Sequence, residues 1–177
     1  NIRYELKDIP ESLLVDYQDD NRTCLHVAAE DEDFEMISIL FEKLSDEDKL
    51  RLLTLEAKDA DTRNKVSWLC MWNGGVTWAM ELANSATHEA IKTEIYTEVL
   101  NYTCQYDDAQ ALHLLLSTVT SDTLMSLMSR FKFGVERHSC IQRAAWLGNS
   151  PFISILLLHF PSDSVLPLLL EQCEGDG

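Results

Sequence analysis

The sequence predicts an all-α fold organised as a helical repeat solenoid, and three observations lead to this prediction. Apolar residues make up 46% of the 177 residues, with only 6 Gly and 4 Pro, which suits a folded chain rather than a low-complexity one. Apolar residues also recur at the spacing of one helix face. Finally, two segments match each other without a gap at a separation of 116 residues. Such self-similarity is typical of stacked repeats.

The two matching segments predict the same pair of helices. Residues 23–29 (TCLHVAA) and 139–145 (SCIQRAA) begin the copies, and residues 34–41 and 150–157 follow as second helices. The second helices carry apolar residues at i, i+3 and i+4, namely Ile37, Leu40 and Phe41, then Ile153, Leu156 and Leu157. Gly148 supplies a turn glycine in the second copy, where the first copy has Glu32.

This pattern resembles the ankyrin repeat, whose T-P-L-H-x-A-A signature opens a short helix. In that family a turn glycine follows, and the second helix ends in paired leucines. Leu40-Phe41 and Leu156-Leu157 occupy the positions of that pair. The resemblance implies finger loops before the first helices and a concave groove that binds partner proteins.

Two less regular copies lie between the clear ones. Residues 65–74 keep a small residue and the turn glycine, and residues 76–82 follow as a second helix. Residues 98–104 keep a small pair and are followed by an apolar stripe at Leu112, Leu115 and Leu116. The copies start at residues 23, 65, 98 and 139, at intervals of 42, 33 and 41. One interval equals the 33-residue ankyrin period and the other two exceed it.

An extra segment accounts for the longer intervals. Residues 44–53, 119–128 and 160–169 each predict a helix end, a Ser or Asp cap and a short apolar helix. The predicted boundaries are 1–18 for the end of a preceding repeat, 19–60, 61–93, 94–134 and 135–173 for four repeats, and 174–177 for the next finger. We therefore expect one array that is cut from a longer one.

Small residues are expected to set the stacking distance, because larger side chains would hold neighbouring helices apart. They stand in the first helices at Ala28-Ala29, Cys70, Thr103-Cys104 and Ala144-Ala145. No unit can bury its apolar stripe alone, so neighbouring units share their stability. A charge at Ala145 is therefore expected to loosen more than one repeat.

The chain is strongly acidic, with a formal net charge of -16. This charge repels phosphate backbones and anionic membranes, so we expect a basic partner and no nucleic acid. Membrane insertion is not expected either, because the longest apolar run, residues 153–160, is too short to span a bilayer.

The 5 cysteines form no CxxC pair, which suits reduced thiols in a cytoplasmic protein.

The sequence contains no motif for catalysis or for cofactor binding. Cys24 lies near His26 and His138 near Cys140, but the predicted register separates the pairs by three repeats, on the order of 25 to 30 Å. One zinc ion could not use both pairs. We therefore expect no enzyme, no catalytic residue, no metal and no cofactor. The ankyrin resemblance implies that His26 bonds a neighbouring finger.

The resemblance also implies where a partner would bind. Positions after the small residues are Glu30, Asp31, Trp72, Asn73, Gln105, Tyr106, Trp146 and Leu147. Finger positions are Asp19, Asp20, Arg22, Asp61, Asn64, Glu136 and His138, and those of the third repeat are Glu94, Ile95 and Thr97. Such a groove would be acidic at its N-terminal end and aromatic further along.

An alternative places Trp72 and Trp146 beneath the inter-repeat segments, because large aromatic side chains are usually mostly buried. Trp68 and Trp78 are expected in the core.

The leading hypothesis is a non-enzymatic protein-interaction module that binds a basic or basic-amphipathic segment of another protein through this groove. Acidic residues would steer the encounter, and aromatic residues would supply affinity. The alternative is a structural spacer that holds flanking catalytic, channel or signalling domains. A third possibility, an enzyme, has no motif in its favour.

Overall fold

Helices dominate the computed structural model of this chain. It describes residues 23–58, 63–65, 70–71, 74–130, 132–133, 138–161, 163–165 and 167. Within these residues the strands form two short antiparallel pairs and nearly all other regular structure is helical. The predicted helical fold class is therefore confirmed. The chain divides into two compact units, residues 1–95 and 96–177, and each is described by itself.

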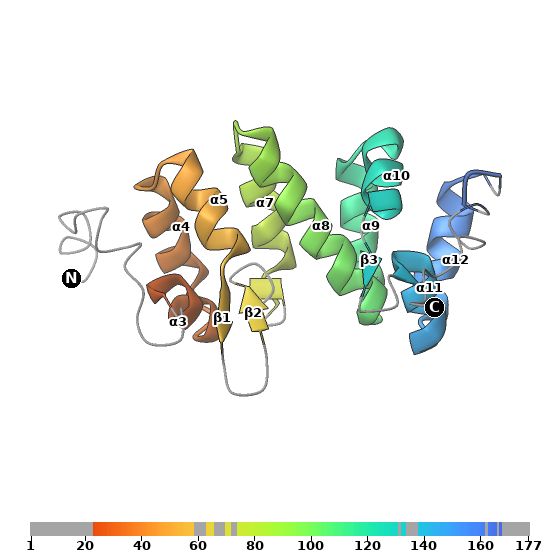
Figure 1. Ribbon diagram of the computed structural model, residues 1–177, viewed down its shortest axis with the longest axis horizontal. Coiled ribbons are helices and arrows are strands. Elements are labelled where there is room, and N and C mark those ends of the chain that lie inside the picture. Colours follow the sequence, from red (N-terminus) through yellow and green to blue (C-terminus); the bar gives the residue numbers. More distant parts are fainter. Residues whose placement is uncertain are drawn as a thin grey trace, which may run out of the picture. The chain divides into compact units, whose positions relative to one another are not determined.

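Unit 1 consists of helices joined by short turns and one hairpin. Its elements are α3 (Cys24–Glu30), α4 (Phe34–Glu42), α5 (Asp46–Thr54), β1 (Glu56–Lys58), β2 (Arg63–Lys65), α7 (Val76–Ser85) and the first part of α8 (Glu89–Gln105) (Figure 1). Strands β1 and β2 pair from Glu56 with Lys65 to Lys58 with Arg63. The hairpin therefore occupies part of the segment that the sequence predicted as a finger.

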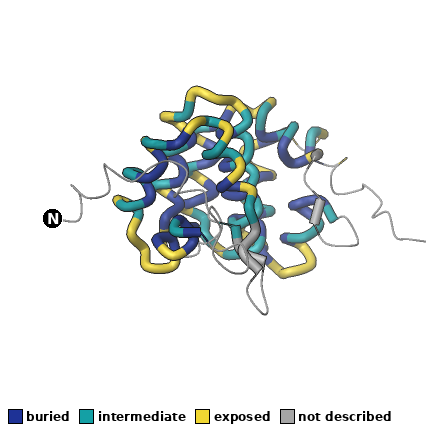
Figure 2. The backbone as a smooth tube through the Cα atoms, turned by 60° about the vertical axis from the view of Figure 1, so that its left-hand side comes forward, coloured by how far each residue is buried: buried dark blue, intermediate teal, exposed yellow. Residues whose placement is uncertain are grey.

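Unit 2 repeats this order of elements. It holds the rest of α8, then α9 (Ala109–Thr118), α10 (Ser121–Arg130), β3 (Lys132–Phe133), β4 (His138–Ser139), α11 (Cys140–Leu147) and α12 (Ser150–His159). Strands β3 and β4 pair Lys132 with Ser139 and Phe133 with His138. Buried and exposed residues alternate along the helices (Figure 2), as expected for helices that each bury one face.

The turns into the second helices share one backbone geometry at three places. The N–H groups of Asp33, Gly75 and Asn149 each donate to a carbonyl five residues earlier, at 2.9, 2.7 and 2.8 Å. The preceding residue has a positive φ in all three turns: 60° at Glu32, 84° at Gly74 and 74° at Gly148. This combination ends a helix by satisfying its last carbonyls. Glu32 thus adopts the left-handed conformation for which the other turns use glycine.

The second helices begin at the predicted spacing. Their N-caps are Asp33, Gly75, Asp108 and Asn149, which lie 42, 33 and 41 residues apart. Side chains of the Asp and Asn caps accept a backbone N–H from the first turn, the usual role of these residues at a helix start. Gly75 is required for a different reason, because a Cβ there would lie 2.6 Å from the Cys70 carbonyl oxygen.

Two first helices open with the same reciprocal cap. In α3 the Thr23 N–H donates to His26 Nδ1 at 3.1 Å, and in α11 the Ser139 N–H donates to Gln142 Oε1 at 2.9 Å. Each pair forms a capping box. His26 is fully buried, and its Nδ1 therefore acts in helix initiation.

The extra short helices are present. Ser45 Oγ accepts the Asp48 N–H at 3.1 Å at the start of α5, so the predicted serine cap is confirmed. In α10 it is Thr120, rather than a Ser or Asp, that accepts the Thr123 N–H at 3.3 Å. Residues 163–165 are also helical.

The finger predicted for the third repeat is wrong. Helix α8 runs without a break through Glu94, Ile95 and Thr97. Residues 89–105 contain neither glycine nor proline, so nothing in the local sequence stops the helix. Ile95 is buried, and Glu94 forms an ion pair of 2.9 Å with Lys65 of the hairpin.

The small residues of the first helices are buried, with one exception. Ala28, Ala29, Cys70, Cys104 and Ala144 are at most 7% exposed, as is Thr103. Ala145 is exposed, so the expectation that a charge there would loosen the fold is wrong. The buried face of α11 contains Ile141 and Ala144 at i and i+3, and the next residue turns away from it.

We expect Ala144→Asp to destabilise the chain by about 3 kcal/mol or more, because it places an unpaired charge in the core. Ala145→Asp is the matched control on the same helix, and its melting temperature should stay close to that of the wild type. Thermal unfolding followed by circular dichroism measures both. Equal losses of stability would show that this helix face is wrongly assigned.

The described cysteines are free thiols, and most are buried. Burial raises the pKa of Cys70 from its ordinary value of 9.0 to about 12. As the pH rises, the Cys70 thiol ionises at a lower pH in the unfolded chain than in the folded chain. The contribution of the protonated thiol to the free energy of unfolding is therefore complete below pH 9 and falls between pH 9 and 12. The reactive thiolate is suppressed in the folded chain at neutral pH.

We predict that iodoacetamide at pH 8 alkylates Cys70 at least about tenfold more slowly than the half-buried Cys24, because the thiolate is both rarer and less accessible. Peptide mass spectrometry after timed quenching gives the two rates. In guanidinium chloride the rates should converge. Rapid labelling of Cys70 in the native chain would contradict its burial.

Candidate functional site

Trp146 is the most conspicuous side chain of unit 2, because it is 68% exposed. It lies in the last turn of α11 beside Leu147, which is 42% exposed. The Arg143 guanidinium lies 4.7 Å from the indole centroid, within range of a cation–π contact. The alternative of a covered side chain is therefore excluded for Trp146, whereas Trp72 lies outside the described residues.

Two tyrosines stand at the end of α8. The rings of Tyr102 and Tyr106 are 5.1 Å apart at 34°, a tilted arrangement that aromatic pairs favour. Both are half-buried. Burial raises the pKa of each hydroxyl, and the charge of Asp108 raises that of Tyr102 further. Both hydroxyls are therefore neutral hydrogen-bonding groups at physiological pH.

Asn149 ties the end of α8 to the turn after α11. Its Nδ2 donates to the carbonyls of Thr103, Cys104 and Tyr106 at 3.0, 3.2 and 3.1 Å. Its Oδ1 accepts the Phe152 N–H at 3.1 Å and so caps α12. The last carbonyls of a helix have no partner within it, and here a buried amide supplies one. Asn149 is 7% exposed.

Helices α8 and α11 each carry a buried cysteine. Cys104 of α8 and Cys140 of α11 are both fully buried. Burial raises the pKa of Cys104, the neighbouring Cys140 raises it further, and the Arg143 guanidinium opposes this shift. The Cys104 thiol is therefore protonated at neutral pH.

The Asn149 hydrogen bonds join the end of α8 to the turn after α11, so we treat the predicted positions at the ends of these two helices as one region. We call it the aromatic surface, and it consists of Tyr102, Gln105, Tyr106, Arg143, Trp146 and Leu147. Four of these residues were predicted from the sequence. Tyr102 and Arg143 were missed, although each stands one helical turn before a predicted residue, and that spacing could have indicated them.

The other predicted positions have different outcomes. Glu30 and Asp31 are exposed at the end of α3 in unit 1. Asn64 belongs to β2, and His138 belongs to β4 and is half-buried. The remaining positions lie outside the described residues: Asp19, Asp20, Arg22, Asp61, Trp72, Asn73 and Glu136.

Within the described part of the chain, no three His, Cys, Asp or Glu side chains are grouped so that they could hold a metal ion. No helix in the same part is long and apolar enough to cross a membrane.

Comparisons with protein-family models, with curated proteins and with solved structures gave no match to this chain. The ankyrin resemblance therefore rests on the residues given above and stays a prediction.

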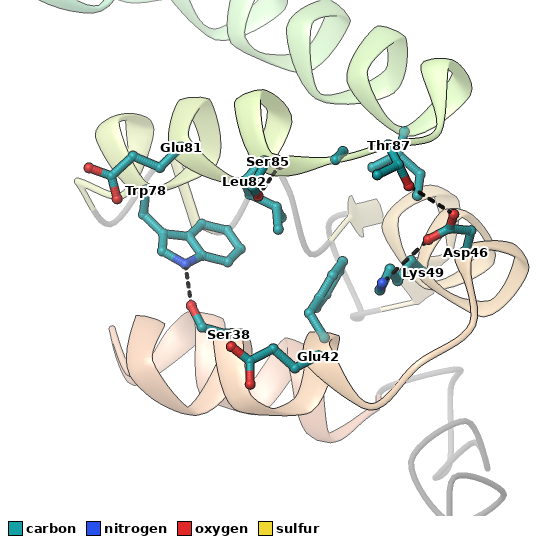
Figure 3. A pocket seen from close by; sticks show the side chains of 12 residues that line it. Ser38, Glu42, Asp46, Lys49, Trp78, Glu81, Leu82, Ser85 and Thr87 are labelled. Carbon is teal, nitrogen blue, oxygen red and sulfur yellow. Dashed lines mark hydrogen bonds and ion pairs between the residues drawn. The ribbon is translucent and has the colours of Figure 1, made fainter.

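The structure also contains a cavity that sequence reasoning missed. It opens between α4 and α7 in unit 1 and is lined in part by Trp78 (Figure 3). Trp78, which the sequence placed in the core, is half-buried and forms one wall of this cavity. No periodic pattern could have indicated the cavity, because its walls come from four helices, α4, α5, α7 and α8.

We predict that Asn149→Asp destabilises unit 2 by about 2 to 4 kcal/mol, because a carboxylate would face three carbonyls in place of a donor. Aspartate caps helices as well as asparagine does, so loss of the cap cannot explain such an effect. Asp108→Asn is the matched control and should change stability by less than about 0.5 kcal/mol. Urea unfolding monitored by circular dichroism measures both, and equal values would refute the role of the amide.

Proposed function

We propose that this chain is a non-enzymatic protein-binding module, and that its aromatic surface binds a basic, partly apolar segment of a partner. The observation that carries the proposal is the 68% exposure of Trp146 on a helix whose Ile141 and Ala144 are fully buried. A tryptophan in this position loses hydrophobic stabilisation unless something covers it. Tryptophan and tyrosine are also enriched among residues that dominate binding energy.

The rigidity of the surface supports the proposal. Asn149 fixes the end of α8, so Tyr106 is anchored through its own carbonyl. Arg143 lies over the Trp146 ring, 4.7 Å from its centroid. Side chains that are ordered before binding lose less conformational entropy when a partner docks.

Net charge supports a basic partner. The chain has a formal net charge of -16, and Asp107 stands exposed in the turn after Tyr106. Long-range attraction of this kind accelerates the encounter and weakens as salt is added. The apolar area around Trp146 would then supply most of the affinity.

We further propose that the helix pairs form an ankyrin-like solenoid. Four N-caps at intervals of 42, 33 and 41 residues support it, as do the three turns with a shared backbone geometry. Cytoplasmic location and the lack of catalytic activity belong to the same proposal. In such arrays, extended surfaces formed by successive repeats bind other proteins.

Trp146→Ala should weaken partner binding by at least about tenfold without lowering the melting temperature, because an exposed anchor adds affinity rather than stability. Peptides selected from a random displayed library against the wild-type chain provide the ligands, and fluorescence polarisation provides Kd. Selected peptides should be rich in Lys or Arg with apolar neighbours, and Kd should rise with salt.

Leu158→Ala is the control, because Leu158 is 88% exposed on α12 and outside the aromatic surface. It should leave Kd unchanged. Full affinity in the Trp146→Ala protein would overturn the assignment and leave the spacer function as the better explanation.

A further inference from the structure

The cavity between α4 and α7 has the size of a small-molecule site. Its volume is about 460 Å³, which falls in the range of ligand pockets. Phe41 and Ile91 line it and are each 2% exposed, so its apolar lining belongs to the packed core of unit 1. The cavity is therefore held open by the fold itself.

Trp78 forms one wall and is fixed in place. Its Nε1 donates to Ser38 Oγ at 2.8 Å, and that hydroxyl donates to the Phe34 carbonyl at 2.9 Å. The rings of Phe34 and Trp78 stack with centroids 5.8 Å apart. With its polar edge already bonded, the indole offers the cavity an aromatic surface (Figure 3).

The charges at the rim are unbalanced. Lys49 Nζ lies 3.3 Å from Asp46 Oδ1, and Thr87 donates to the other Asp46 oxygen at 3.5 Å, so these groups satisfy one another. Glu42 of α4 and Glu81 of α7 also line the cavity, from opposite sides (Figure 3). Neither carboxylate has an ion pair or a hydrogen bond to any residue that the structure describes.

We propose that this cavity binds a cationic group carried on an apolar or aromatic body. The apolar body would lie against Trp78 and Leu82, which line the cavity and are half-buried. The ammonium or guanidinium would lie between Glu42 and Glu81. Cations are attracted both by carboxylates and by the face of an indole ring. An anion would be repelled, and a neutral molecule of the same shape would lose the ionic contribution. The ligand is either a free amine or a lysine or arginine side chain of a partner.

Three probes of matched shape and different charge test this proposal: 2-phenylethylamine, 2-phenylethanol and 3-phenylpropionate. Nuclear magnetic resonance of the ¹⁵N-labelled chain follows the indole N–H signal of Trp78, assigned from the Trp78→Phe protein. We expect the amine to shift this signal with saturation, at a Kd at least about fivefold below that of the alcohol. The carboxylate should give no saturable shift.

Two double variants test whether the rim carboxylates, rather than the net charge of the chain, attract the amine. Glu42→Gln with Glu81→Gln should raise the Kd of the amine by about five- to tenfold. The matched control, Glu47→Gln with Glu89→Gln, removes the same charge from exposed positions outside the cavity and should leave Kd within about twofold. Because all four side chains are exposed, both proteins should fold, and the Trp78 signal reports whether they do.

The proposal is overturned if amine and alcohol bind equally, if no probe shifts the Trp78 signal, or if both double variants behave alike. A peptide with one central lysine, compared with its norleucine counterpart, distinguishes the two sources. Binding of the lysine peptide would assign the cavity to a partner's side chain. Binding of the free amine with no binding of the peptide would assign it to a small ligand.

Discussion

The buried amide of Asn149 is the interaction on which the architecture of unit 2 depends. Helix α8 ends with carbonyls that its own backbone cannot satisfy, and these carbonyls are buried against the next pair of helices. Asn149 donates to two of them, those of Thr103 and Cys104, and to the Tyr106 carbonyl just beyond the helix, while its oxygen caps α12. Aspartate could cap the helix but not donate, and serine is too short to do both. One side chain thus sets both where α8 ends and where α12 begins.

Three of the turns that lead into second helices share one backbone geometry. A helix ends with a residue of positive φ at Glu32, Gly74 and Gly148, and an N-cap follows directly. The chain thereby reverses direction in very few residues while its backbone groups stay bonded. Short turns leave the second helices close to the first. The predicted apolar stripes of α4 and α9 are buried, whereas α12 buries Phe152 and Leu156 and leaves the predicted Leu157 43% exposed. The turn before α9 differs, because Asp108 bonds to Tyr106 at 2.8 Å instead, and the helix before it is the long α8.

Two surfaces result from this packing, and they differ in character. The aromatic surface of unit 2 presents Trp146 outward, where its area is available to a large partner. The cavity of unit 1 opens between α4 and α7 and has Trp78 as one wall. Both are aromatic in a strongly acidic chain, and this shared character is the basis for proposing ligands that combine positive charge with apolar area.

The sequence by itself determined the helices, their caps and their spacing, because capping and amphipathic periodicity act within a few residues. It also placed Trp146 and Tyr106 among the candidates. Only the tertiary structure decided that Trp146 is exposed and that Ala145 is not a packing residue. Exposure and cavities depend on which distant segments cover a residue. The walls around Trp78 come from separate helices, and no local pattern encodes how they meet.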